Sequence, residues 1–278
     1  MNPTDVAAAL ASALLHAAWN AAIKTSPNPA KAMTAQMLLG AILVIPVLFW
    51  TGLPNSAAWG WIAASTFLNV VTISALLRAY ELGGFGVVYP VVRSVAVLLV
   101  VPLSAVLTGD QLGFTGLLGI LVIASSLVLL GWDAARGHGV PPATAGWMLA
   151  AGLGTAAYIM CDAQGVRTSG SPLAYGFTVS LTNALAMSWR QRHAGPPWRH
   201  VRSQWIVALP VAVASMVSYL LILWVWGHAP IAPAAALRDT SAIFAVLIAV
   251  LWLKEPFTRL RIGAVILAAM AVPLLRLG

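Results

Sequence analysis

Polar and aromatic side chains interrupt an apolar segment near the start of the chain, in the stretch LLHAAWNAAIK that covers residues 14–24. His16, Trp19 and Asn20 are spaced by three and four residues, so on a helix they share one face. The histidine and the asparagine offer hydrogen bonds, and the tryptophan offers an aromatic wall with a single N–H donor. This face is therefore predicted to line a path for a small molecule.

Charged residues also lie inside apolar segments, namely Arg93, Asp162, Arg238 and Asp239. Each costs ~2.5–3.5 kcal/mol at the centre of a bilayer on the insertion scale, so each is expected to face a cavity or a partner. For the two arginines the alternative is that their long side chains reach the lipid headgroups. Asp162 could instead meet water at the end of its helix. Arg238 and Asp239 need not pair, because adjacent side chains on a helix point about 100° apart.

Aromatic side chains with a polar tip complete the candidate site, since they combine apolar contact with a hydrogen bond. The candidate substrate-binding residues are His16, Trp19, Asn20, Tyr80, Tyr89, Arg93, Tyr158, Asp162, Tyr219, Trp224, Arg238 and Asp239. Arg78 and Glu81, three residues apart near the end of a segment, are instead expected to form an ion pair at the membrane interface.

These residue types suit a zwitterion with a hydrophobic side chain. An arginine can hold a carboxylate through two parallel hydrogen bonds, and Asp162 could attract an ammonium group. Tryptophan and tyrosine suit an apolar or aromatic body. The sequence therefore predicts a site for amino acids such as phenylalanine, tryptophan or methionine, and the alternative substrate class is cationic drugs.

Motifs of enzymes are absent from the sequence, which has no nucleophile elbow, Gly-rich phosphate loop or metal-ligand spacing. We therefore expect a protein that is not an enzyme and that uses no metal or other cofactor. Two alternatives to a transporter remain open. One is a membrane-embedded enzyme with His16 and Asp162 as acid and base, and the other is a non-transporting sensor or scaffold. His16 is also the candidate for proton coupling, since the ordinary pKa of histidine lies near neutrality.

The composition places these residues in a membrane protein. Of the 278 residues, 60% are hydrophobic and 8% are charged, whereas soluble domains carry roughly 25% charged residues. Mean hydropathy is +0.90. The net charge of +8 would suggest nucleic acid in a soluble protein, but here loop lysines and arginines that set the topology account for it. The predicted fold class is an all-α polytopic membrane protein.

Ten apolar segments of about 20 residues, each long enough to cross a ~30 Å hydrocarbon core, are separated by turn-forming clusters. Their approximate bounds are 3–24, 31–52, 57–82, 87–108, 111–132, 143–164, 171–190, 203–227, 230–252 and 256–277. Most of the connections are short, so successive helices are expected to be antiparallel neighbours.

An internal repeat relates residues 93–130 to residues 238–275 without gaps, and it aligns Arg93 with Arg238. Both copies have an arginine, a long apolar helix, an acidic residue at a tight turn (Asp110 or Glu255) and another helix. Each half would hold five helices. An odd number makes the second half enter the membrane from the opposite side, as in the inverted repeats of many transporters.

The lysines and arginines predict the orientation, because ten of the 15 lie on loops that follow odd-numbered helices. Only Arg167 and Arg276 lie on the other side, and three more lie within spans. The positive-inside rule then places both termini outside the cytoplasm. The loop from Gln191 to Arg202, which four arginines occupy or flank, is predicted to be cytoplasmic.

The stretch HAAWNAAIK, the five-plus-five helices and the acidic turns in GDQLGFTGLLG and KEPFTRLRIGA resemble the EamA-type branch of the drug/metabolite transporter superfamily. The resemblance covers essentially the whole chain, so residues 1–138 and 139–278 would each be one EamA-like repeat. It implies a basket of helices one to four and six to nine around a central cavity, with helices five and ten outside. Members move small metabolites and many export amino acids; the YddG-type aromatic amino-acid exporters are one such group.

Partners and location are expected to follow the same pattern. The expected partners are a small-molecule substrate and the lipid bilayer, without nucleic acid, and the chain is expected to be a monomer in a bacterial inner (plasma) membrane. Many family members are drawn with both termini in the cytoplasm, opposite to the orientation that the charges predict. We follow the charges, because ten residues against two is a large margin, and the direction of transport stays open.

Overall fold

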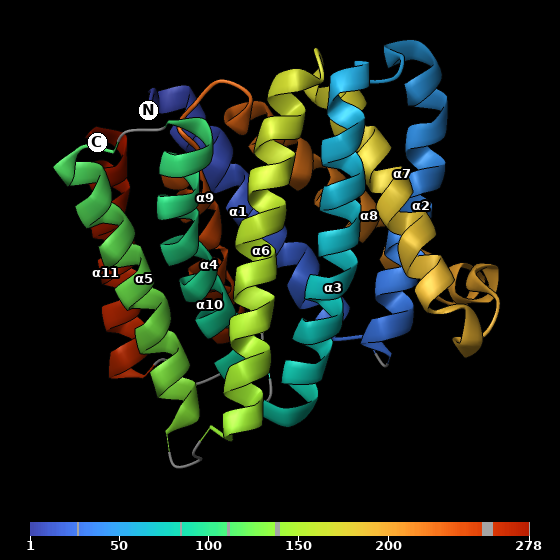
Figure 1. Ribbon diagram of the computed structural model, residues 1–278. Coiled ribbons are helices and arrows are strands. Elements are labelled where there is room, and N and C mark those ends of the chain that lie inside the picture. The colour runs from blue at the N-terminus through green and yellow to red at the C-terminus, as the bar shows by residue number, and fades with distance from the viewer. Residues whose placement is uncertain (27, 84, 110–111, 137–139, 252–257, 278) are drawn as a thin grey trace.

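The computed structural model describes residues 1–26, 28–83, 85–109, 112–136, 140–251 and 258–277, and the structured segments among them are helical (Figure 1). The first half contains α1 (Pro3–Lys24), α2 (Pro29–Thr51), α3 (Trp59–Gly83), α4 (Phe85–Thr108) and α5 (Phe114–Ala135). The second half contains α6 (Pro142–Thr168), α7 (Pro172–Arg190), α8 (Pro197–Trp226), α9 (Ile231–Asp239), α10 (Ser241–Leu251) and α11 (Arg259–Leu277). Short 3-10 turns, η1 (Ser56–Ala58) and η2 (Arg192–Ala194), precede α3 and follow α7.

The helices follow the predicted segments with two differences. The ninth segment is broken at Thr240 into α9 and α10, and the eighth starts six residues earlier than predicted, at Pro197. Arg199 and Arg202 therefore lie in the first turns of α8 rather than in a loop. The acidic turn residues Asp110 and Glu255 lie outside the described residues.

Nine of the described spans are long and apolar enough to cross a membrane, with the segment Ile231–Ile248 of α9 and α10 counted as one. Helix α7 is the tenth candidate. It has 19 residues, but it carries several hydroxyl and amide side chains and is not apolar enough to be counted among the nine. The fold is thus all-helical with nine to ten candidate membrane helices.

Local signals explain where several helices begin. Pro is at the first turn of α1, α2, α6, α7 and α8, where its missing N–H is not needed by the helix. Asn2, Asn28 and Ser171 accept hydrogen bonds from backbone N–H groups three residues later and so cap α1, α2 and α7. The turn clusters that separate the apolar segments in the sequence therefore act as helix caps.

Helices from the two halves interleave. Helix α3 packs along α6, α1 and α2 pack against α8, and α4 packs between α5 and α6. Helices α5 and α11 lie side by side at one edge of the bundle (Figure 1). The two termini lie at the same end of the bundle, where the amino group of Met1 donates to the carbonyl of Arg276 over 3.1 Å.

Large apolar side chains cover the outside, as expected where lipid replaces water. Trp50 and Trp132, near helix ends, are 85% and 67% exposed and suit the interfacial belt of a membrane protein. Arg78 Nη1 and Glu81 Oε2 are 2.6 Å apart on the exposed surface of α3, which confirms the predicted ion pair.

Candidate functional site

Polar groups gather in the interior around Arg93, where α1, α4 and the break between α9 and α10 meet. We call this the Arg93 cluster: His16, Tyr89, Arg93, Asp239 and Ser241. Arg93 donates from Nη1 to Asp239 Oδ1 over 3.0 Å, and its Nη2 lies 2.8 Å from His16 Nε2. A guanidinium can only donate, so Nε2 of His16 accepts this hydrogen bond. The cluster ties three chain segments together through one side chain.

The break at Thr240 positions the far side of this cluster. Asp239 is the last residue of α9, and Ser241, the first residue of α10, is bonded to the Tyr89 hydroxyl over 3.1 Å. Arg93 itself lies over the Tyr89 ring, 5.2 Å from its centroid. Since Arg93 is buried among these groups, the alternative that it reaches the lipid headgroups is wrong.

The polar face predicted on α1 is only partly directed at other helices. Trp19 packs edge-on against His16, with ring centroids 5.0 Å apart, and its Nε1 has no hydrogen-bond partner in the described part of the chain. Asn20 donates from Nδ2 to the carbonyl of His16 over 2.7 Å. His16 therefore reaches another helix, while the Asn20 amide is used by its own helix.

A second group of polar residues surrounds Asp162 on α6, and we call it the Asp162 cluster: Ser65, Asp162, Tyr175 and Tyr219. Oδ1 of Asp162 accepts from Ser65 Oγ at 2.5 Å and from the Tyr175 hydroxyl at 3.1 Å. Oδ2 accepts from the Tyr219 hydroxyl at 2.8 Å. The carboxylate is only 2% exposed, so the alternative that it meets water at the helix end is wrong.

Glycine at position 165 allows Tyr175 to approach α6. A Cβ atom at Gly165 would collide with the Tyr175 ring, so a larger residue there would push the tyrosine away. Because Gly165 is three residues after Asp162, it lies on the same side of α6. The close contact brings the Tyr175 hydroxyl to the carboxylate.

The two clusters lie at different depths in the bundle. Asp162 is six residues, about 9 Å, from the end of α6 at Thr168. Arg93 is 15 residues, about 22 Å, from the end of α4 at Thr108. Both of these helix ends point to the side of the bundle that carries the termini (Figure 1), so the Asp162 cluster is nearer that side.

Arg238 lies between the clusters. It is 6% exposed, and within the described ranges it makes no hydrogen bond or ion pair. Its guanidinium carbon is 5.7 Å from the ring centroid of Trp226, whose Nε1 is also buried without a partner there. It is close enough to interact electrostatically with both His16 and Asp162. Burial excludes the alternative that Arg238 extends to the headgroups.

The remaining predicted residues divide into two groups. Tyr80 and Tyr158 are partly buried and close enough to Arg93 to interact electrostatically with it. Trp224 is 41% exposed and packs on His228 with ring centroids 4.6 Å apart. The structure thus brings the two tyrosines toward the Arg93 cluster and leaves Trp224 on the outside.

The proposed acid and base of an enzyme are not joined. His16 is bonded to Arg93, and Asp162 is bonded to three hydroxyl groups; no hydrogen bond links the two in the described residues. The geometry that the enzyme hypothesis requires is therefore not present in this structure.

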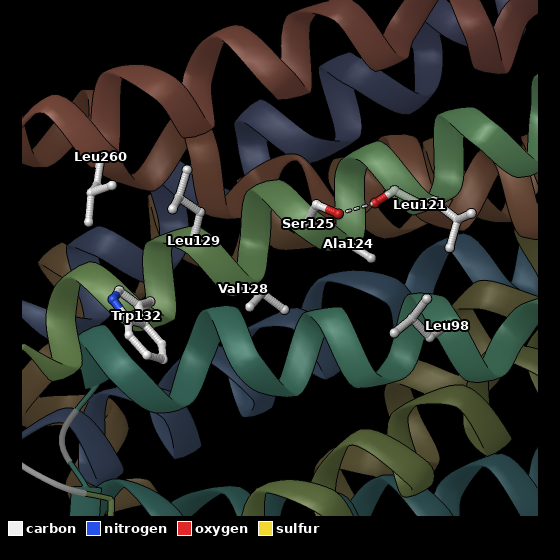
Figure 2. A pocket seen from close by; sticks show the side chains of 8 residues that line it. All are labelled: Leu98, Leu121, Ala124, Ser125, Val128, Leu129, Trp132 and Leu260. Atoms are coloured by element: carbon white, nitrogen blue, oxygen red, sulfur yellow. Dashed lines mark hydrogen bonds between the residues drawn. The ribbon is translucent and has the colours of Figure 1, made fainter.

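Two pockets are described, and both lie at the outer surface of the bundle. One has a volume of about 450 Å³ and lies where α4, α5 and α11 meet; Figure 2 shows its lining, which includes Leu98, Val128 and Trp132. The other, of about 810 Å³, lies between α3 and α7. Neither is lined by Arg93, Asp162 or Arg238, so the implied central cavity is not one of these two pockets.

Several participants were missed by sequence reasoning, namely Ser65, Ser241 and Trp226. A signal for Ser65 was available, because Ser65, Asn69 and Thr72 are spaced by four and three residues and so form a polar face on their helix. Trp226 carried no comparable signal, since it lies in an apolar stretch, whereas Ser241 directly follows the polar run of residues 238–240.

The apolar exterior, the bundle of long helices and the buried charges define a multi-pass α-helical membrane protein. The sequence profile of the EamA-like transporter family matches residues 4–132 and 143–277. The chain therefore belongs to the EamA-like transporter family, within the drug/metabolite transporter superfamily.

A crystal structure described as "Crystal structure of protein" has the same fold, with a TM-score of 0.75 and 17% sequence identity. The similarity covers 100% of this chain and 98% of that chain. No curated protein matches the sequence. Family and fold thus define a membrane transporter for small molecules, built from two EamA repeats.

Proposed function

We propose that this transporter exports amino acids with apolar or aromatic side chains across the bacterial inner membrane. The observation that carries the proposal is a pair of opposite interior charges, Arg238 and Asp162, neither of which has an ion-pair partner among the described residues. A free amino acid carries the two complementary charges on one carbon atom. Its carboxylate and ammonium groups would therefore neutralise both residues at once.

Arg238 is assigned to the substrate carboxylate. A buried guanidinium without a hydrogen-bonded counterion is costly within a membrane, and a carboxylate can accept two parallel hydrogen bonds from it. The neighbouring Trp226 contributes an aromatic ring and a buried N–H donor that has no partner among the described residues. This combination suits an anionic group next to an apolar body.

Asp162 is assigned to the substrate ammonium group. Its three hydroxyl partners fix the carboxylate in one orientation, and an ionised carboxylate has about four acceptor positions, so one remains for a further donor. The hydroxyl groups compensate for part of the cost of burial without neutralising the charge. A cation on the substrate would do so.

Transport is proposed to proceed by alternating access between two inverted repeats, residues 1–138 and 139–278. In the two repeats α1 is equivalent to α6, α3 to α8, and α4 to α9 and α10 together. The packing supports this symmetry: α3 and α4 of the first repeat pack on α6, and their equivalents α8, α9 and α10 pack on α1. The charged residues are less than a tenth exposed, so substrate entry requires the halves to move apart. The protein is proposed to do this as a monomer.

His16 is the proposed residue for proton coupling. Its Nε2 already accepts a hydrogen bond from Arg93. A proton taken up at Nε2 would replace that acceptor with a donor and place two cationic groups side by side. Protonation would therefore loosen the contact between α1 and α4, which links proton binding to movement of the helices.

The proposed orientation keeps the basic helix ends in the cytoplasm and both termini outside. A cysteine introduced at Ser203, which is exposed on the first turns of α8, should resist an impermeant thiol reagent added to intact cells. A cysteine introduced at exposed Thr168, at the opposite end of the bundle, should react. The reverse pattern would invert the orientation.

The substrate assignment is tested by counterflow in proteoliposomes. Phenylalanine, tryptophan and methionine should exchange faster than glutamate or lysine. Replacement of Trp19, which contacts His16, by alanine should reduce this flux more than replacement of exposed Trp50. A preference for quaternary ammonium compounds would instead identify a cationic-drug exporter, and equal losses in both tryptophan variants would remove Trp19 from the substrate path.

A further inference from the structure

The outer groove between α3 and α7 has a charged end, unlike an ordinary lipid-facing surface. We define the α3–α7 groove by six of its lining residues: Trp59, Phe67, Val70, Ala186, Trp189 and Arg190. Its volume of about 810 Å³ is within the range of about 300–1,000 Å³ that is typical of small-molecule sites. We propose that it binds an anionic phospholipid, with one acyl chain along the groove and the headgroup at the basic end.

The direction of the groove follows from the relative orientation of α3 and α7. Asn55 N–H donates to the carbonyl of Ser169, so the two helices start at the same end of the bundle. Further along, Thr66 and Thr182 are hydrogen-bonded, with their hydroxyl oxygens 2.7 Å apart. The helices are therefore parallel neighbours, and the groove extends from the start of α3 to the end of α7.

The length of the groove fits a lipid tail. From Trp59 to Thr66 and from Thr182 to Arg190 the helices advance 15 residues in total, which is about 22 Å at 1.5 Å per residue. One leaflet of a ~30 Å hydrocarbon core takes about half of that thickness. An acyl chain can thus lie in the groove while its headgroup remains at the end of α7.

The floor of the groove suits an apolar occupant. Both threonine hydroxyls are satisfied, because they bond to each other and Thr182 also bonds to the carbonyl of Val179. Phe67 and Trp189 are largely exposed and form apolar walls on the two sides. A hydrocarbon chain laid over this floor would leave no polar group of the floor without a partner.

The basic end of the groove is complementary in charge to the phosphate group of an anionic phospholipid. Arg190, Arg192 and His193 are exposed there, and in the described part of the chain no carboxylate pairs with them. Arg192 is held in place: its guanidinium carbon is 4.4 Å from the ring centroid of Trp189, and its Nη1 donates to the Trp189 carbonyl over 2.9 Å. Its other N–H groups remain for a phosphate oxygen.

The other outer pocket provides an internal control. The pocket at α4, α5 and α11 is mostly apolar: none of its lining residues is charged, and the hydroxyl of Ser125 donates to the Leu121 carbonyl on its own helix (Figure 2). This pocket can contact the acyl chain of any lipid, but it has no charged residue that would distinguish one headgroup from another. Selection by charge is therefore expected at the α3–α7 groove.

The test is native mass spectrometry of the full chain in detergent with added phosphatidylglycerol or phosphatidylcholine of identical acyl chains. The wild-type protein should retain phosphatidylglycerol preferentially. The double variant Arg190→Gln/Arg192→Gln should lose about fivefold in affinity per arginine, or about 25-fold in total. The matched control Arg199→Gln/Arg202→Gln removes the same charge from the same end of the bundle and should change the affinity less than threefold.

A third variant tests the tail. Ala186→Phe would fill the groove and should weaken binding of both lipids without abolishing the preference for phosphatidylglycerol. Equal losses in the two double variants, or no preference in the wild type, would overturn the proposal, because diffuse charge attraction would then explain the binding. So would an unchanged lipid affinity of Ala186→Phe together with lost amino-acid flux, since the groove would then be a substrate portal. Lipid retention needs no transport, so it is independent of the proposed function.

Discussion

Arg93 and Arg238 align in the internal repeat, yet their surroundings differ. Arg93 is bonded to Asp239 and His16 and lies over Tyr89. Arg238 is buried to the same degree, but in the described residues it makes neither a hydrogen bond nor an ion pair. Equivalent positions in a repeat thus carry the same residue with different partners.

The difference indicates two roles for one residue type. A buried charge that is paired and hydrogen-bonded holds segments together, and it is costly to disrupt. A buried charge without a partner has no such role in this arrangement of the helices. It is suited to a partner that arrives and leaves, which is what a transported ion or zwitterion does.

The largest effect is expected from breaking the paired arginine. Arg93→Met would leave buried Asp239 without its hydrogen-bonded counterion and should lower the free energy of unfolding by about 3–5 kcal/mol. Arg238→Met should change it by less than about 1 kcal/mol, because no bonded partner is lost. Chemical unfolding in mixed micelles measures both. Equal losses would mean that Arg238 has a structural partner after all.

The transport assay sharpens the same comparison. Arg238→Met should reduce phenylalanine counterflow about 30-fold, the equivalent of about 2 kcal/mol for a hydrogen-bonded charge pair. Arg238→Lys retains the charge without the two-pronged geometry and should give an intermediate rate. A folded Arg238→Met protein with full activity would contradict the assignment of the substrate carboxylate.

Removing one bond from the Asp162 cluster should have a smaller effect. Tyr219→Phe removes the one hydroxyl among the described residues that donates to Oδ2 of Asp162, and it should lower the free energy of unfolding by about 1.5 kcal/mol, as expected for a hydrogen bond to a charged group. Tyr158→Phe is the matched control, because no hydrogen bond of its hydroxyl occurs in the described part of the chain. If the two variants unfold alike, the Tyr219 contact contributes nothing.

The smallest effect is expected from the exposed pair. Arg78 and Glu81 are as close as an ion pair can be, at 2.6 Å, but both side chains are more than half exposed. Arg78→Gln should therefore shift the unfolding free energy by less than about 0.5 kcal/mol. Comparison with Arg93→Met separates the effect of burial from the effect of distance. A loss above 1 kcal/mol would show that the surface pair is not screened.

The fold was largely predictable because membrane spans are coded by local composition. Apolar length, turn clusters and loop charges are properties of consecutive residues, and they sufficed for nearly all of the helices. The break at Thr240 was not predicted, since the residues around it lack the proline and glycine that usually mark a break. Its position depends on contacts such as Tyr89 with Ser241, which lie 152 residues apart in sequence.

The charged residues of the site could be identified from the sequence, but the partners to which they bond could not. Arg93, Asp162, Arg238 and Asp239 stood out because ionised groups are rare in apolar segments. Which of them pair could not be derived, because pairing depends on how helices from the two halves cross. The role of Ser65 could not be derived from its polar helix face alone, since a serine hydroxyl can also bond to its own helix and then needs no partner elsewhere.

Helix α7 has a consequence for how the chain is made. It is the one helix of 18 or more residues, within the described ranges, that is not apolar enough to span a membrane by its own composition. It packs against α2, α3 and α8, and α8 follows it after a connection of only six residues, 191–196. We therefore expect α7 to enter the bilayer together with α8 as a helical hairpin. During translation, α7 would then not be inserted in the bilayer until α8 has been synthesised. The second repeat would therefore reach its final topology late in translation.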